Sequence, residues 1–148
     1  MSFEISQSEA DALIAMIKIR IDDTTHKYPD IGNSLRIPLI SENRRHEFML
    51  DITRSKIELN KGSFQNRARQ TVILLRLCFG GQPHKNPDDT RISCPHLHSY
   101  KEGYADKWAI PLPEKIFFNP INQWQTLQEF MLLCNIINPP IIAKGLFT

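Results

Sequence analysis

The sequence lacks the features by which membrane, secreted and redox-active proteins are usually recognised. No apolar run approaches the roughly 20 residues of a membrane-spanning helix, so no membrane partner is expected. No basic stretch followed by an apolar one stands near the first residue, so no signal peptide is expected. The three cysteines, Cys78, Cys94 and Cys134, include no C-x-x-C pair, which argues against a zinc knuckle or a thioredoxin-type motif. We therefore expect a cytoplasmic protein in a reducing compartment.

A strong charge of one sign and the common phosphate- or metal-binding motifs are also missing. The net charge of +2 at pH 7 is too small to indicate nucleic acid by itself. No Walker loop, G-x-G-x-x-G or H-E-x-x-H motif is present, and no cofactor is expected. The remaining composition, with 41% hydrophobic and 23% charged residues, is ordinary for a globular protein, and 148 residues fit one domain over 1–148.

The two ends of the chain carry helix signals. A Ser-x-x-Glu capping box at residues 6–9, followed by apolar residues at helical spacing, predicts a helix that ends near Thr25. A second capping box at 126–129 predicts a helix that stops at Asn138 and the two prolines after it. The buried stripe of this second helix is predicted to be Leu127, Phe130, Met131 and Cys134.

The middle of the chain predicts strands. The segments expected to be extended are 47–52, 56–60, 71–79, 96–100 and 106–110. The first two flank Arg54-Ser55 and predict a hairpin. The third is apolar at nearly every position, which is typical of a central strand covered on both faces, with a buried helix as the alternative. Pro111 and Pro113 restrict the last to an edge or an end of the sheet. The sequence thus predicts the α+β class, with a central antiparallel sheet of about five strands and an N-terminal and a C-terminal helix.

Histidines concentrate in one part of this sheet. If residues 96–100 are extended, His96, His98 and Tyr100 point to one face, and the preceding loop places His84 where it could fold over that face. Two imidazoles with a carboxylate are enough to bind a divalent metal ion, or to act as general acid and base on a phosphodiester. The carboxylates within reach in sequence are Asp88, Asp89, Glu102 and Asp106. The competing interpretation is a set of half-exposed polar residues without chemistry.

Basic residues form a second feature. Arg67 and Arg69 share one face if the segment that begins at Phe64 is extended, which is typical of a phosphate-binding surface. The cations on the preceding segments are Arg44, Arg45, Arg54, Lys56 and Lys61. Acidic residues are interspersed among them, so a solvated mixed surface is the competing interpretation.

Arg76, inside the apolar run 71–79, is unusual. A buried guanidinium needs a carboxylate or carbonyl partner, so we predict that Arg76 pairs with an acidic residue of the 102–106 turn. Near this turn Tyr100, Tyr104 and Trp108 form an aromatic group, which either anchors a partner or, as we expect for Trp108, packs the turn against the core.

The central motif resembles a known family. The residues that carry the likeness are Leu74-Leu75-Arg76-Leu77, Gly80-Gly81-x-Pro83-His84-x-Asn86-Pro87-Asp88, His96-Leu97-His98-x-Tyr100-x-Glu102-Gly103-Tyr104-x-Asp106-Lys107-Trp108-Ala109 and Phe130-x-x-x-Cys134-Asn135-Ile136. They are similar to a family of small uncharacterised proteins found in bacteria, phages, prophages and other mobile elements. The likeness spans about residues 64–136, and it implies a setting of phage–host conflict without implying any catalytic residue.

The sequence leads to one main functional hypothesis and two alternatives. The main one is a small accessory protein of a mobile element that binds a host or phage protein, as an inhibitor or as a member of a defence or toxin–antitoxin pair. Its expected surface lies within 82–108, with His84, His96, His98, Tyr100 and Glu102 at the centre. One alternative is a ribonuclease-like toxin with His96 or His98 as general base and Arg67, Arg69 or Lys107 holding phosphate. The other is a non-catalytic nucleic-acid-binding module that uses Arg67 and Arg69.

Overall fold

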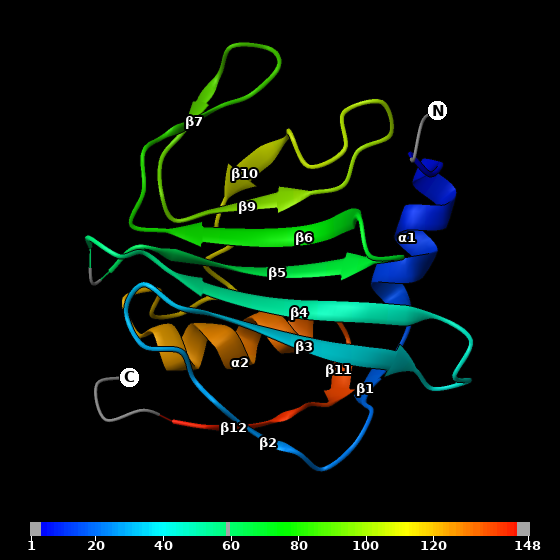
Figure 1. The fold of residues 1–148 in the computed structure, drawn as a ribbon. Coiled ribbons are helices and arrows are strands. Elements are labelled where there is room, and N and C mark those ends of the chain that lie inside the picture. The colour runs from blue at the N-terminus through cyan, green and yellow to red at the C-terminus, as the bar shows by residue number, and fades with distance from the viewer. Residues whose placement is uncertain (1–3, 59, 145–148) are drawn as a thin grey trace.

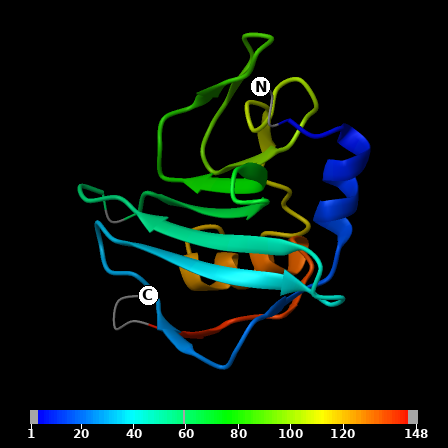
Figure 2. The same cartoon turned by 45° about the vertical axis from the view of Figure 1, so that its right-hand side comes forward.

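The protein is organised around one eight-stranded sheet, with helix α2 against one face and helix α1 beside the ends of the strands (Figures 1 and 2). The computed structural model describes residues 4–58 and 60–144. Its elements are α1 (Gln7–Ala15), β1 (Lys18–Arg20), β2 (Thr25–Lys27), β3 (Ser34–Ser41), β4 (Glu47–Arg54), β5 (Gly62–Ala68), β6 (Val72–Phe79), β7 (His84–Lys85), β8 (Arg91–Ile92), β9 (His96–Ser99), β10 (Ala109–Pro111), α2 (Gln123–Leu133), β11 (Ile136–Asn138) and β12 (Ile141–Ala143).

The main sheet has the strand order β10-β9-β6-β5-β4-β3-β1-β11, while β12 pairs with β2 and β7 with β8. The predicted α+β class is confirmed, with a helix near each end, but a sheet of about five strands was too small an expectation. No helix within the described residues is long and apolar enough to cross a membrane.

Helix α1 begins where it was predicted to begin. It ends at Ala15, ten residues before the predicted end at Thr25. The Ser6 hydroxyl accepts a hydrogen bond from the Glu9 N–H, as a capping box requires. The prediction that the helix continues to Thr25 is wrong, because the chain turns extended at Met16 and enters β1. The β-branched Ile17, Ile19 and Ile21 alternate with polar residues there, which is a strand pattern that the helical spacing had masked.

The predicted hairpin around Arg54-Ser55 is also wrong. Strand β4 forms as expected, but its next partner is β5, and the segment between them is not a strand among the residues described. Ile57, in the segment 56–60 that was expected to be extended, is 92% exposed, and Leu59 lies outside the described residues. On its other side β4 pairs with β3, which was not predicted, and which carries Pro38 at an exposed position between the buried Ile37 and Leu39.

The N-cap of helix α2 lies four residues before that of the predicted capping box. Asn122 is the N-cap, and its side-chain oxygen accepts from the Gln125 N–H, so Thr126 lies inside the helix. The helix ends at Leu133, and Asn135 takes a positive φ of 58° before β11 begins. The predicted buried stripe is confirmed, since Leu127, Phe130, Met131 and Cys134 are 0–4% exposed.

The two faces of the sheet differ in chemistry. Phe64 of β5 packs on Phe130 of α2 and lies opposite Leu77 of β6, so this face belongs to the apolar core. The alternate residues of β6, Arg76 and Cys78, point to the other face and are only half-buried. Strand β6 is central as predicted, but its second half is not covered evenly on both faces.

Candidate functional site

Strand register builds a cluster on the face of the sheet away from α2. In the antiparallel pair of β6 and β9, Cys78 lies opposite His96 and Arg76 opposite His98. Because residues two apart in a strand share a face, these four side chains stand together, and His98 is the diagonal neighbour of Cys78. The predicted strand at 96–100 therefore forms, and the register with β6 gives its histidines a cysteine neighbour.

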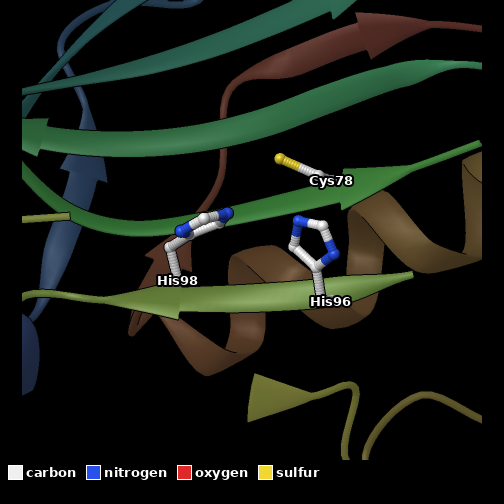
Figure 3. A group of neighbouring side chains, drawn as sticks. All are labelled: Cys78, His96 and His98. Atoms are coloured by element: carbon white, nitrogen blue, oxygen red, sulfur yellow. The ribbon is translucent and has the colours of Figure 1, made fainter. Parts of the chain in front are cut away.

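The side chains of Cys78, His96 and His98 converge (Figure 3). One ligand atom from each, the Cys78 sulfur and one nitrogen of each ring, lies within 4.8 Å of the other two. The centroids of the two rings are 4.9 Å apart at an interplanar angle of 74°. His96 and His98 are only 3% and 2% exposed, so the cluster is buried against the sheet.

Neighbouring groups fix which nitrogen of each ring faces the cluster. His98 Nδ1 lies 2.8 Å from the Asp106 carbonyl oxygen, which can only accept, so Nδ1 donates and Nε2 keeps the lone pair. The Cys94 thiol donates to the Gln82 carbonyl, so its sulfur accepts from His96 Nδ1 at 3.4 Å. Figure 3 shows the remaining nitrogen of each ring directed toward the other ring and Cys78.

Burial keeps this cluster uncharged. Burial, with a smaller effect of the Arg76 charge, lowers the pKa of His98 to about 4. Burial likewise lowers the pKa of His96, partly offset by a hydrogen bond to the Ser93 backbone. The pKa of the Cys78 thiol is raised by burial against the opposing pull of Arg76. At neutral pH the cluster therefore consists of two neutral imidazoles and a thiol.

The loop before β9 folds over the cluster, as its sequence position suggested. His84 on β7 places its ring centroid 4.6 Å from that of His98 and donates from Nε2 to the Lys107 carbonyl at 2.6 Å. Asn86 holds the loop in place by two hydrogen bonds with the backbone of Ala109 on β10. The 84–92 segment is thus attached to the edge of the sheet, with His84 beside His96 and His98.

A pocket of about 490 Å³ opens between this loop and the sheet. All three histidines, Cys78 and Arg76 line it, together with Lys61 from the end of the β4–β5 connection. Arg76 pairs with Asp106 at 2.7 Å, which confirms the predicted partner in the 102–106 turn. The Nε atom of Arg76 is buried without a hydrogen-bond partner among the described residues. The pocket wall therefore combines imidazole and thiol groups with the two cations Arg76 and Lys61.

Several residues predicted for the site have structural roles elsewhere. The Tyr100 hydroxyl donates to the Ile5 carbonyl and accepts from its N–H, so Tyr100 joins the core and does not share the wall with the histidines. Glu102 accepts from the Gln7 N–H at the start of α1. Lys107 offers His84 its backbone carbonyl, while its side chain is exposed.

The acidic residues of the loop are not at the cluster either. Asp88 accepts from the hydroxyl and the N–H of Thr90, which lowers the pKa of its carboxyl. Asp89 pairs with Lys85 at 3.2 Å on the surface. The carboxylate expected beside the two histidines is therefore absent from the described cluster, and a sulfur takes its place.

The two arginines expected to share a face do not do so. Arg67 on β5 forms a bidentate pair with Asp51, with a shortest distance of 2.6 Å. Arg69 lies in the turn after β5 with a φ of 51° and pairs with Glu9 of α1 at 3.1 Å. The extended geometry assumed for 64–69 ends at Ala68, so Arg67 and Arg69 do not form one phosphate-binding surface.

Within the aromatic group, Trp108 packs on other residues of its own turn, and the expected packing against the core is not found among the described residues. It is half-buried, its ring contacts that of Tyr104 at 5.7 Å, and the Lys101 ammonium lies 4.3 Å from its centroid. Tyr100 is not part of this arrangement.

The site residue that the sequence analysis missed is Cys78, which was considered only as part of the apolar run 71–79. The available signal was alternation: Arg76 and Cys78 are two residues apart, as are His96 and His98, so pairing the two strands brings four polar side chains together.

These features define an α+β protein whose large sheet has one apolar face under a helix and one polar face with a histidine- and cysteine-lined pocket. The chain belongs to DUF6978, a family of unknown function whose model matches residues 5–136. This confirms the expectation of an uncharacterised family and extends it toward the N-terminus, while the mobile-element setting stays a prediction. No curated protein and no solved structure matches the chain.

Proposed function

We propose that this protein acts by binding a partner and not by catalysing a reaction, and that the pocket between residues 81–84 and the sheet is its binding site. The observation that carries the proposal is the pocket of about 490 Å³ with three histidines, two cysteines and two cations on its wall. Concave sites with a few convergent polar groups are the usual place for ligand recognition.

The partner we propose presents an acidic group. Arg76 and Lys61 are the charged residues of the pocket wall, and both are cations. Since Asp106 neutralises much of the Arg76 charge, Lys61 is the cation that a carboxylate or phosphate of the partner would meet. The role of inhibitor of a host protein, or of member of a defence or toxin–antitoxin pair, enters this proposal from the sequence resemblance.

The ribonuclease-like alternative finds less support in this geometry. A histidine pair that acts as acid and base needs one imidazolium at working pH, whereas the pKa of His98 is about 4 and that of His96 is also lowered. Arg67 and Arg69, which were to hold phosphate, are paired with Asp51 and Glu9. Both arginines are therefore engaged outside the histidine pocket.

Gly81 offers a matched pair of variants that fill the pocket or leave it open. A Cβ at Gly81 would contact Lys61 and Cys94 at 3.6 and 3.7 Å, which is ordinary van der Waals contact, so Gly81→Ala is tolerated. Gly81→Trp places an indole in the same direction and blocks the pocket. Tagged wild type, Gly81→Ala and Gly81→Trp are expressed in cells, cross-linked and purified, and the co-purified proteins are quantified by mass spectrometry.

We expect a partner that wild type and Gly81→Ala retain and Gly81→Trp loses, while both variants melt at the wild-type temperature. Retention of every partner by Gly81→Trp would refute the pocket as the binding site. Cleavage of RNA by the purified wild type that is abolished by His98→Ala would instead support the catalytic alternative.

A further inference from the structure

We propose that Cys78, His96 and His98 form a zinc site, with three protein ligands and the fourth coordination position open toward the pocket. The site lies in the pocket proposed for partner binding, but zinc binding is a property of the isolated protein, so either proposal can fail without the other.

The donor atoms suit a borderline-soft divalent ion. Thiolate sulfur and imidazole nitrogen are the ligands that zinc prefers, whereas magnesium and calcium require oxygen. In a tetrahedral zinc site with bonds of about 2.0–2.3 Å, ligand atoms are separated by about 3.4–3.6 Å. The three atoms here lie within 4.8 Å of one another, so each moves by about 1 Å or less to reach that arrangement.

The surroundings of the two histidines match those of metal ligands. In most metal sites the nitrogen that does not bind the ion donates its proton to a backbone carbonyl or another acceptor, which fixes the tautomer and the ring orientation. His98 does this through Nδ1 to the Asp106 carbonyl, and His96 through Nδ1 to the Cys94 sulfur. Both rings therefore present the Nε2 lone pair to the cluster without rearrangement.

The three side chains cannot complete one another's hydrogen bonds, although the Cys78 side chain also has a hydrogen bond with Arg76. A thiol has one proton, whereas the two imidazoles offer two lone pairs, so the three groups cannot satisfy one another by hydrogen bonds. A zinc ion accepts both lone pairs and the sulfur at once. On binding, the Cys78 S–H bond breaks, its electron pair forms the S–Zn bond and the proton passes to the buffer.

The position of the site in the pocket decides its class. Structural zinc sites are closed by four protein ligands, whereas sites that exchange ligands keep an open position. All three proposed ligands line the pocket, so the fourth position faces it. Blue copper centres also use two histidines and one cysteine, usually with a weak axial Met, and no methionine is among the described residues that line this pocket.

The charge nearest to the site does not prevent cation binding. The Arg76 guanidinium stands opposite His98 in the register, but Asp106 pairs with it at 2.7 Å and offsets its charge. A zinc ion with one thiolate adds a single positive charge to this pair. A carboxylate or phosphate that enters the pocket would supply the fourth ligand and the missing negative charge.

Cobalt gives the sharpest test, because it takes the place of zinc and reports its ligands in the visible and near-ultraviolet spectrum. Purified wild type is dialysed against a chelator and titrated with Co²⁺. We expect tetrahedral d–d bands and a thiolate-to-cobalt charge-transfer band that saturate at one ion per chain, and that Zn²⁺ abolishes. Zinc at a hundred times its Kd should raise the Tm by about 5–10 °C. Calorimetry in two buffers should show about one proton released per zinc ion.

The variants separate this site from non-specific thiol binding. Cys78→Ser should lose the charge-transfer band and bind zinc at least about 100-fold more weakly, since even loss of an outer partner costs 10–100-fold. His98→Asn should weaken zinc binding by a similar factor. It replaces Cys78→Ser in the test if Cys78→Ser does not fold. Cys94→Ser, which changes a neighbouring thiol outside the donor set, should keep the band. The proposal is overturned if wild type gives no charge-transfer band, or if the band survives Cys78→Ser and disappears with Cys94→Ser.

Discussion

The Lys18 ammonium and the Cys78, His96 and His98 cluster are both buried polar sites, and they differ in how their bonding capacity is used. Lys18 is 0% exposed and donates to the carbonyls of Ile14 and Met16, at the end of α1, and of Cys134, at the end of α2. An ammonium has three protons, so every donor is satisfied within the protein. In the cluster, by contrast, ligand atoms converge and line a pocket.

This contrast separates a structural site from a site that is available for binding. Lys18 joins the C-terminal ends of both helices, where carbonyls without intrahelical donors collect. Its bonds are internal, so we expect it to contribute to stability. The cluster has the opposite character, and changing it should cost little stability and remove binding.

The largest effect is expected for Lys18→Met, which keeps the apolar stem and removes the ammonium. Three carbonyls would lose a donor, and breaking a buried charged contact costs about 3–5 kcal/mol of unfolding free energy. Urea unfolding at pH 7 measures it. Lys27→Met is the matched control, because Lys27 is 71% exposed and pairs with Asp30 on the surface, so its change should stay within about 0.5 kcal/mol. Equal effects of the two substitutions would contradict the structural role of Lys18.

A second effect of the same residue is its pH dependence. Burial lowers the pKa of Lys18 from 10.5 to about 8, so between pH 8 and 10.5 the unfolded chain holds a proton that the folded chain has released. Stability that depends on Lys18 therefore rises with pH across that window, by roughly 2–3 kcal/mol. The gap between wild type and Lys18→Met should widen from pH 8 to pH 10.5. A constant gap would show that Lys18 keeps its ordinary pKa in the folded state.

The same contrast explains how far the sequence could predict the fold. The start of α1 and the buried stripe of α2 depend on local capping and periodicity, and both were predicted correctly. The end of α1 was not, because Lys18 is fixed by Cys134, which is 116 positions away in the sequence. Tertiary partners of that kind override local helical spacing.

The candidate site was predicted in part for a similar reason. The alternation of His96 and His98 is a local property of one strand, and so was found. Their contact with Cys78 depends on the register between β6 and β9, which no single segment encodes. Arg76 is the exception, since the cost of an unpaired guanidinium in an apolar run predicted its acidic partner before the pairing was known.

Arg76→Leu should have an effect on stability between those expected for Lys18 and for the Cys78, His96 and His98 cluster. The Arg76 and Asp106 side chains are 27% and 26% exposed, so the pair is partly screened by solvent. We expect a loss of about 1–2 kcal/mol in unfolding free energy, between the values for surface and buried pairs. Lys85→Leu breaks the exposed pair with Asp89 and should cost less than about 0.5 kcal/mol.

A double-mutant cycle with Asp106→Asn isolates the pair itself. That change keeps the backbone carbonyl that orients His98. A coupling energy near zero would show that Arg76 is held by its surroundings and not by Asp106.

The smallest effect on stability is expected for Cys78→Val. This variant is the strictest test of the contrast between Lys18, as a structural site, and the cluster, as a binding site. Valine has a similar volume, tolerates a β-strand and places no polar atom beside the two imidazoles. Because Cys78 is half-buried and its sulfur is in the proposed metal site, the unfolding free energy of the metal-free protein should change by less than about 0.5 kcal/mol. In zinc the result should differ, since wild type gains stability and Cys78→Val does not. A large loss already in the metal-free protein would place Cys78 with Lys18, as a residue that the fold requires.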